Sequence, residues 1–227
     1  MEQIKNKPWH KNWLGRILII IGVFILIILT AFIFLIIDII RHPQNKKISN
    51  NITANEPNQK IAEGGDNYWF GSANPEITIV EFSDFACPYC EQSYSKIRQI
   101  SLKYKNEVKL IYRDFPLRQA YSIDLAMAGR CAGEQGLFWL MHDKLFARQG
   151  EFELSQLSDF ANQIGANLNK FNDCLKNEKY LNDIKKDYAD GESLEVTGTP
   201  TWFINGYKIA GDIPHDLFIQ IIEELIP

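Results

Sequence analysis

The sequence is short of the residues that bind structural metals. It contains four cysteines and four histidines in 227 residues, and only Cys87 and Cys90 are closely spaced. Cys131 and Cys174 stand alone, and the histidines form no cluster. A tetrahedral zinc site normally takes a second closely spaced pair of ligands. We therefore expect no metal centre.

Positive charge is also scarce in residues 66–227, where 16 lysines and arginines face 24 aspartates and glutamates, a net charge of −8. Nucleic acids and anionic membrane surfaces attract basic domains rather than acidic ones. We therefore do not expect nucleic acid among the partners of this protein. The remaining chain, at roughly 160 residues, is long enough to bury a core of its own.

Only one stretch is free of charge over the thickness of a membrane. Residues 17–37 form an apolar run of 21 residues, which as a helix would span roughly 31 Å. A signal peptide has a shorter apolar core, of about 7–15 residues, and a small-residue cleavage site, which residues 38–43 lack. We expect an uncleaved transmembrane anchor at residues 17–40, with a cleaved signal peptide as the alternative.

The flanks of this run suggest its orientation and the start of the next domain. Residues 1–16 carry four basic side chains, against three soon after the run, so the positive-inside rule weakly favours a cytoplasmic N-terminal segment. Residues 41–66 are rich in asparagine and contain glycine and proline without an apolar period. That composition predicts a flexible linker, and residues 67–227 would then form the folded domain.

The order of the expected elements indicates an α/β domain. An apolar strand leads into a helix and a second strand, and a long helical stretch precedes a hairpin and a final helix; the residues are 76–84, 87–104, 107–115, 117–195, 201–210 and 216–225. A right-handed crossover pairs the first two strands in parallel, and Asn-Gly is a strong hairpin signal. The order resembles a thioredoxin-like fold with a helical insertion at about 117–195.

Cys87 and Cys90 fall where the first strand gives way to a helix. Unpaired backbone N–H groups and the helix dipole at this end favour a thiolate at Cys87. Cys90 lies one turn deeper on the same helix face. A structural disulfide would close too small a loop to stabilise much, and half of a zinc site lacks its other ligands. A redox pair remains the favoured interpretation.

The motifs "DFACPYC" and "GTPTWFING" together resemble the DsbA-like thiol:disulfide oxidoreductases, in particular the membrane-anchored members. The resemblance covers nearly all of residues 67–226 and implies the role of each matching residue. Cys87 would be the nucleophile and Cys90 the resolving thiol. Pro200 would be a cis-proline facing the pair, and Thr199 would offer backbone groups to an extended substrate.

The resemblance also bears on the residues around the cysteine pair. It implies that Glu81 is a buried acid that relays protons to Cys90. Asp84 is the nearer alternative for this role. Glu81 would have no such role if its side chain pointed outward from the strand. Pro88 and Tyr89 would border the substrate. This dipeptide lacks the histidine of the strongly oxidising relatives, so we expect a weaker oxidant.

Cys131 and Cys174 have two interpretations. They are either two buried free cysteines or a second disulfide, which some members of the family carry in the helical insertion. A disulfide would close a loop of about 44 residues and stabilise the domain by roughly 4 kcal/mol. It would also indicate an oxidising compartment.

The resulting hypothesis is a plasma-membrane protein with one anchor and an extracytoplasmic domain. It would introduce disulfides into cysteine-containing secreted or membrane proteins and be reoxidised by a quinone-linked membrane oxidase. Its redox-active disulfide would serve in place of a bound cofactor. A reductase or isomerase using the same cysteines is one alternative, and a tethered peptide-binding or chaperone module is another.

Overall fold

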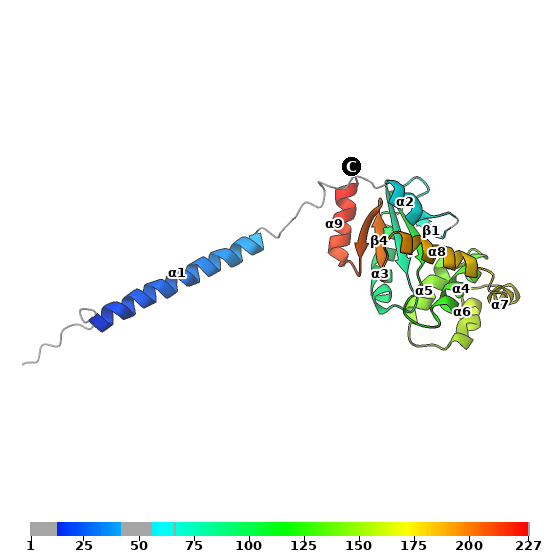
Figure 1. The fold of residues 1–227 in the computed structure, drawn as a ribbon, viewed down its shortest axis with the longest axis horizontal. Helices are drawn as coiled ribbons and strands as arrows, with labels where there is room; N and C mark the ends of the chain where they lie inside the picture. The colour runs from blue at the N-terminus through cyan, green and yellow to red at the C-terminus, as the bar shows by residue number, and fades with distance from the viewer. Residues whose placement is uncertain (1–12, 42–55, 66, 227) are drawn as a thin grey trace, which may run out of the picture. The chain divides into compact units, whose positions relative to one another are not determined.

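The computed structural model describes residues 13–41, 56–65 and 67–226, which belong to two units considered separately. The first unit contains the helix α1 (Trp13–Arg41), drawn in blue in Figure 1. Its segment Arg16–Ile37 is long and apolar enough to cross a membrane, with a mean hydropathy of 3.4 over 22 residues. At 1.5 Å per residue this segment measures about 33 Å. The helix is therefore compatible with the single-pass anchor expected at residues 17–40.

The second unit is built on a sheet whose strand order in the described residues is β1-β3-β2-β4-β5. The strands are β1 (Trp69–Gly71), β2 (Ile77–Ser83), β3 (Val108–Asp114), β4 (Thr201–Ile204) and β5 (Tyr207–Ala210). β2 and β3 are parallel, whereas β4 pairs antiparallel with β2 and forms a hairpin with β5. The predicted β-α-β and β-β-α halves are thus present. β1 was not predicted, because three residues are too few to show an alternating pattern.

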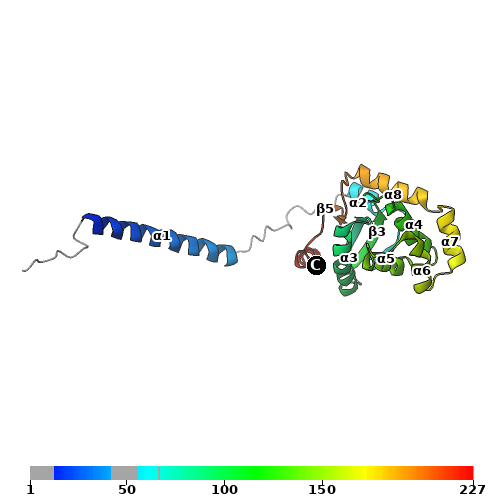
Figure 2. The same cartoon turned by 90° about the horizontal axis from the view of Figure 1, so that it is seen from below.

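Helices cover both faces of the sheet (Figures 1 and 2). Ile77 and Ile79 of β2 pack in a core with α3 (Pro88–Lys103) and α9 (His215–Leu225). The alternate residues of β2, Val80 and Phe82, pack in a second core with residues of α2 (Glu56–Glu63) and of the segment after α8 (Leu181–Ser193). Because side chains alternate along a strand, Glu81 points to the same face as Ile79, toward α3.

The expected helical insertion is present between β3 and β4. Its helices gather at one end of the domain, and α8 returns along the sheet (Figure 2). They are α4 (Ser122–Gly133), α5 (Phe138–Ala147), the 3-10 turn η3 (Leu154–Gln156), α6 (Leu157–Gln163), α7 (Leu168–Lys176) and α8. Cys131 of α4 and Cys174 of α7 form a disulfide, with their Cα atoms 5.8 Å apart. The structure therefore agrees with the second interpretation of these cysteines, a disulfide, and not with two free thiols.

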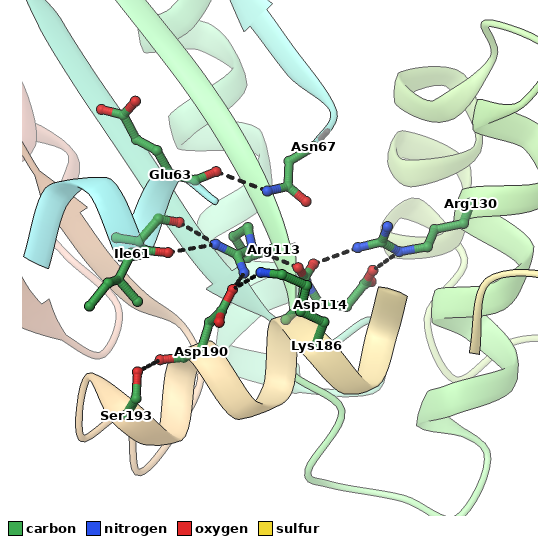
Figure 3. Close-up of polar contacts among 11 residues, drawn as sticks. Ile61, Glu63, Asn67, Arg113, Asp114, Arg130, Lys186, Asp190 and Ser193 are labelled. Carbon is green, nitrogen blue, oxygen red and sulfur yellow. Dashed lines mark hydrogen bonds and ion pairs between the residues drawn. The ribbon is translucent and has the colours of Figure 1, made fainter. Parts of the chain in front are cut away.

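The prediction of a flexible linker at residues 41–66 is wrong for the last part of that range. Residues 56–63 form α2, and Ala62 is fully buried in the domain. Figure 3 shows the reason: the Arg113 guanidinium donates hydrogen bonds to the carbonyls of Ile61 and Ala62, at 3.0 and 2.6 Å. An eight-residue helix with few apolar residues shows no clear period, so only its tertiary contacts reveal it. The linker residues 42–55 and 66 lie outside the described part of the chain, as do residues 1–12.

A buried ion network holds α2, β3, α4 and α8 together (Figure 3). Arg113 pairs with Asp187 and Asp190 of α8, at 2.8 and 2.5 Å. Arg130 of α4 pairs with Asp114 and Asp187, at 2.5 Å each. Burial raises the pKa of Asp114 to about 6, although the neighbouring Arg130 guanidinium opposes this shift. The network joins the helical insertion to the sheet through groups that, apart from the partly exposed Asp190, have little access to water.

Candidate active site

Cys87 occupies the N-cap of α3, with φ −87° and ψ 121°, and Pro88 follows in the first turn. Proline suits this position, where no helical partner exists for its missing N–H. The side chain of Cys87 is fully buried. The pKa of Cys87 is lowered to about 5, mainly by a hydrogen bond from the Cys90 thiol, with smaller contributions from Thr199 and the backbone N–H groups of Cys90 and Tyr89. Burial opposes this shift. At neutral pH the sulfur is therefore largely a thiolate.

Cys90 behaves in the opposite way. It is also buried, and both cysteines are free thiols in the structure. Burial, followed by the hydrogen bond to Cys87 and the charge of Glu81, raises the pKa of Cys90 well above its ordinary value. The pair therefore consists of one thiolate and one thiol, which keeps its proton to donate to its neighbour.

The loop before β4 meets the helix end that carries Cys87. The Thr199–Pro200 peptide bond is cis, as the resemblance implies for Pro200. As a thiol, Cys87 donates a hydrogen bond to the carbonyl of Thr199, with a sulfur–oxygen distance of 3.2 Å. Thr199 and Pro200 are both buried, whereas Tyr89 is 51% exposed beside the pair. Residues about 110 positions apart in the sequence thus share one site.

Glu81 is fully buried in β2, and neither of its carboxylate oxygens has a hydrogen-bond partner among the described residues. Burial raises the pKa of Glu81 to about 8. The nearby Ser83 hydroxyl opposes this shift. The outward-pointing interpretation of Glu81 is therefore wrong. At neutral pH this side chain is a carboxylic acid that holds a proton on the face of the sheet covered by α3.

Asp84 has a different role from the one considered for it. One carboxylate oxygen accepts a hydrogen bond from the backbone N–H of Ala86, at 2.8 Å. The other accepts from the N–H groups of Leu117 and Arg118 and from the Ser122 hydroxyl, at 2.8, 2.8 and 3.0 Å. Asp84 thus ties the loop before Cys87 to the segment after β3. Its lone pairs are occupied, which makes it a poor candidate for proton transfer.

Sequence reasoning missed Gln149, which follows α5. Its side-chain amide donates to the carbonyls of Phe85 and Cys87, at 2.8 and 3.1 Å. The amide therefore fixes the backbone on both sides of Ala86, directly before the reactive pair. No local pattern marks a glutamine for this task, because its partners lie more than 60 residues away.

The buried proton on Glu81 gives a testable pH dependence. We expect Glu81→Gln to raise the free energy of unfolding by roughly 3 kcal/mol at pH 7. The difference in stability between the variant and the parent should grow by about 1.4 kcal/mol for each pH unit above the pKa of the unfolded carboxyl. In the parent, the unfolded carboxyl ionises above its ordinary value of 4.5, whereas the folded carboxyl keeps its proton to about 8. The two chains should be equally stable at pH 4, and the difference between their free energies of unfolding should stop growing above pH 8. Thermal unfolding followed by near-ultraviolet circular dichroism measures it; an equal gap at every pH would contradict the assignment.

A family model described as thioredoxin matches residues 63–224, more than half of the chain. Among curated proteins, the Na(+)/H(+) antiporter NhaA 1 of Salinispora arenicola is 34% identical over 143 residues, and NhaA 1 of Mycolicibacterium gilvum is 30% identical over 157. These alignments cover 62% and 67% of this chain. The chain spans only 22% and 25% of the antiporters' own lengths.

Solved structures with the same fold include a thiol-disulfide exchange protein. Alpha-DsbA2 from Wolbachia pipientis has a TM-score of 0.69 at 22% identity, covering 75% of this chain and 93% of its own. Oxidised BdbD from Bacillus subtilis has a TM-score of 0.63 at 24% identity, covering 70% and 92%. The family match and the shared fold agree with the geometry around Cys87. The chain belongs to the thioredoxin family and has the fold of the DsbA-like thiol-disulfide oxidoreductases.

Proposed function

We propose that this protein is a membrane-anchored thiol:disulfide oxidoreductase that introduces disulfides into other proteins through Cys87 and Cys90. The observation that carries the proposal is the opposite protonation of the two sulfurs. The low pKa of Cys87 makes it a good leaving group, and the high pKa of Cys90 makes it the better proton acceptor. Such a division of roles suits stepwise exchange through a mixed disulfide.

The reaction starts from the Cys87–Cys90 disulfide. A substrate thiolate attacks the Cys87 sulfur, the bond to Cys90 breaks, and Cys90 leaves and takes up a proton. A second substrate thiolate then attacks the substrate sulfur of the mixed disulfide, and Cys87 leaves as a thiolate. The substrate loses two electrons and gains a disulfide. Both of its thiol protons go to solvent, while Cys90 gains one proton from a protein acid that is then reprotonated from solvent.

Glu81 is the proposed source of the proton that Cys90 takes up. Its acid is protonated at neutral pH and lies close enough to Cys90 for its charge to raise the pKa of that thiol. Its oxygens have no competing partner among the described residues. Asp84, with both oxygens accepting hydrogen bonds, lacks this freedom. Thr199 and Pro200 would hold the substrate backbone beside Cys87, with Pro88 and Tyr89 at the border of the same site.

The direction of exchange follows from the stability of the reduced form. A lower pKa of the nucleophilic cysteine stabilises its thiolate and makes the disulfide a stronger oxidant. The value of about 5 at Cys87 lies between about 7 in thioredoxin, a reductant, and about 3.5 in the strong oxidant DsbA. Interpolating between their potentials gives roughly −180 mV for this pair. We therefore propose an oxidant of moderate strength.

The proposed location is the plasma membrane, with residues 1–16 in the cytoplasm, residues 17–40 of α1 as the anchor and the domain outside. The Cys131–Cys174 disulfide supports an oxidising compartment. The substrates would be cysteine-containing secreted or membrane proteins. The two electrons taken from each substrate must leave the reduced pair, and a quinone-linked membrane oxidase is the proposed acceptor.

A redox titration tests the proposal. We expect the full-length chain in detergent to show one reversible two-electron couple at roughly −180 mV in glutathione buffers. Mass spectrometry of alkylated samples should assign the couple to Cys87 and Cys90, with Cys131 and Cys174 bonded throughout. A midpoint near about −270 mV would instead indicate a reductase. Absence of any couple at Cys87 and Cys90 would overturn the exchange function and leave a peptide-binding module.

A further inference from the structure

The register of the sheet identifies the side chains that enclose Glu81. Tyr112 of β3 and Trp202 of β4 are its partners on the two neighbouring strands, at the usual spacing of about 4.8 Å between strands. Ser83 follows two residues later on β2 and faces the same side of the sheet, because side chains alternate along a strand. All four side chains are at most 2% exposed. Any polar partner of Glu81 must therefore come from inside the protein.

Two hydroxyl groups beside Glu81, those of Ser83 and Tyr112, have no hydrogen-bond partner in the described part of the chain. The same holds for both carboxyl oxygens of Glu81. Trp202 differs from these residues, because its indole N–H donates to the carbonyl of Gly211, at 2.9 Å. Buried polar atoms without a partner are uncommon in native proteins and call for an explanation, such as a catalytic role. Two uncommitted donors thus lie beside two uncommitted oxygens.

The Tyr112 ring is fixed by its neighbours. It stacks on Phe85 with ring centroids 5.1 Å apart, and the His142 ring lies edge-on to it at 5.2 Å. Burial, followed by the charges of Asp114 and Glu81, raises the pKa of Tyr112 well above its ordinary value. The phenol therefore keeps its proton at physiological pH and can donate a hydrogen bond without ionising.

The ionisable groups around Glu81 and Tyr112 in the described part of the chain are thiols, acids and one imidazole. They are Cys87 and Cys90 of α3, Asp84 after β2, Asp114 of β3 and His142 of α5. Burial lowers the pKa of His142, so its imidazole is uncharged at neutral pH. A lysine or arginine beside Glu81 would hold the carboxyl permanently ionised. A hydroxyl suits both protonation states, because it can accept a hydrogen bond from the acid and donate one to the carboxylate.

We propose that the Ser83 and Tyr112 hydroxyls stabilise the carboxylate that Glu81 becomes when it gives its proton to Cys90, each donating a hydrogen bond to one oxygen. The inference rests on the proposed exchange function, in which the proton moves from a Glu81 oxygen to the Cys90 sulfur and the negative charge moves the opposite way. A buried carboxylate without donors is strongly unfavourable, so the two hydroxyls make this transfer easier. When solvent returns the proton, they can rotate and accept from the acid again. Ser83 and Tyr112 are thus positioning residues that act through Glu81.

Tyr112→Phe and Ser83→Ala test the inference, because each removes one hydroxyl and keeps the rest of the side chain. The oxidised full-length chain in detergent should oxidise a cysteine peptide about tenfold more slowly in either variant, in second-order rate constant, since each loses one hydrogen bond to a charged group. Tyr188→Phe is the matched control. The Tyr188 ring also stacks on a buried phenylalanine, Phe115, but on the opposite face of the sheet, so this variant should keep the parent rate. Parent rates in both Tyr112→Phe and Ser83→Ala would overturn the inference.

Two further measurements distinguish positioning of Glu81 from a loss of packing. In a Glu81→Gln background neither substitution should slow the reaction further, because no carboxylate forms there; a tenfold loss that persists in that background would contradict the inference. Infrared titration of the reduced chain, with the Glu81 band assigned from Glu81→Gln, should show the pKa of Glu81 raised by about one pH unit in each variant. The sign follows because a lost donor disfavours the charged form, and an unchanged pKa in both variants would also overturn the inference.

The redox couple separates this inference from the proposed function. Tyr112→Phe and Ser83→Ala leave Cys87, Cys90 and the Thr199 carbonyl in place, so both should keep a reversible couple at these cysteines. A parent that has the couple but whose peptide oxidation does not depend on either hydroxyl would overturn the inference and leave exchange in place. A parent without a reversible couple would instead overturn the exchange function itself.

Discussion

Replacing Cys90 by serine should stop exchange at a covalent complex between Cys87 and its substrate. Cys87 would keep its position at the N-cap of α3 and its contact with the Thr199 carbonyl. It could still attack an oxidised substrate and form a mixed disulfide, but no second thiol would stand beside it to resolve the bond. We expect the complex to accumulate to at least half of the variant. Non-reducing electrophoresis and mass spectrometry of the linked peptide measure this yield.

Cys87→Ser is the matched control, because it removes the other sulfur of the same pair. Cys90 is buried and its pKa is well above the ordinary value, so it is a poor nucleophile at neutral pH. This variant should form less than a tenth of the complex seen with Cys90→Ser. Equal trapping by the two variants would contradict the assignment of Cys87 as the attacking residue, since it would mean that the deeper sulfur is equally reactive.

Asp187→Asn should destabilise the domain by about 3–5 kcal/mol, the cost of breaking a buried ion pair from one side. Asp187 is 3% exposed and accepts hydrogen bonds from the Arg113 and Arg130 guanidinium groups and from the backbone N–H of Asp114. Without its charge, two buried cations would face fewer carboxylates. The amide N–H₂ of asparagine would also meet donors where the aspartate had presented an acceptor.

Thermal unfolding of the full-length chain in detergent measures this loss. For a domain of this size, we expect the midpoint to fall by about 10 °C or more, at roughly 2–4 °C per kcal/mol. Asp183→Asn is the control, since Asp183 lies one turn earlier on α8 and is exposed. It should change the free energy of unfolding by no more than about 0.5 kcal/mol. Similar losses in both variants would indicate that the net charge of α8, rather than the buried network, stabilises the fold.

The sequence alone predicts the parts of this molecule that depend on short-range patterns. The apolar strands, the Asn-Gly turn and the cysteine pair at the start of a helix each occupy a few adjacent residues. They predict the β-α-β and β-β-α halves and the position of Cys87 at the N-cap of α3. The family resemblance adds the cis bond before Pro200, which the structure has and which no local pattern marks.

The features that the sequence does not predict depend on contacts between distant residues. Glu81 and Asp84 are both acids near the reactive pair, and only the fold shows that Asp84 has its oxygens occupied while Glu81 has no partner among the described residues. The helix α2 is formed where Arg113 binds its last turn. Gln149 reaches the loop of Cys87 from a separate part of the helical insertion.

The hydrogen bonds from Arg113 to α2 determine how the domain would respond to a pulling force. Tension applied at the N-terminal end of α2 would pass through the Ile61 and Ala62 carbonyls to the guanidinium, and from there into β3 and α8. α3 packs in the core on the other face of the sheet. We therefore expect such a load to affect the reactive sulfur at the N-cap of α3 less than α2 and α8, because the contacts that receive the load lie on the opposite face of the sheet.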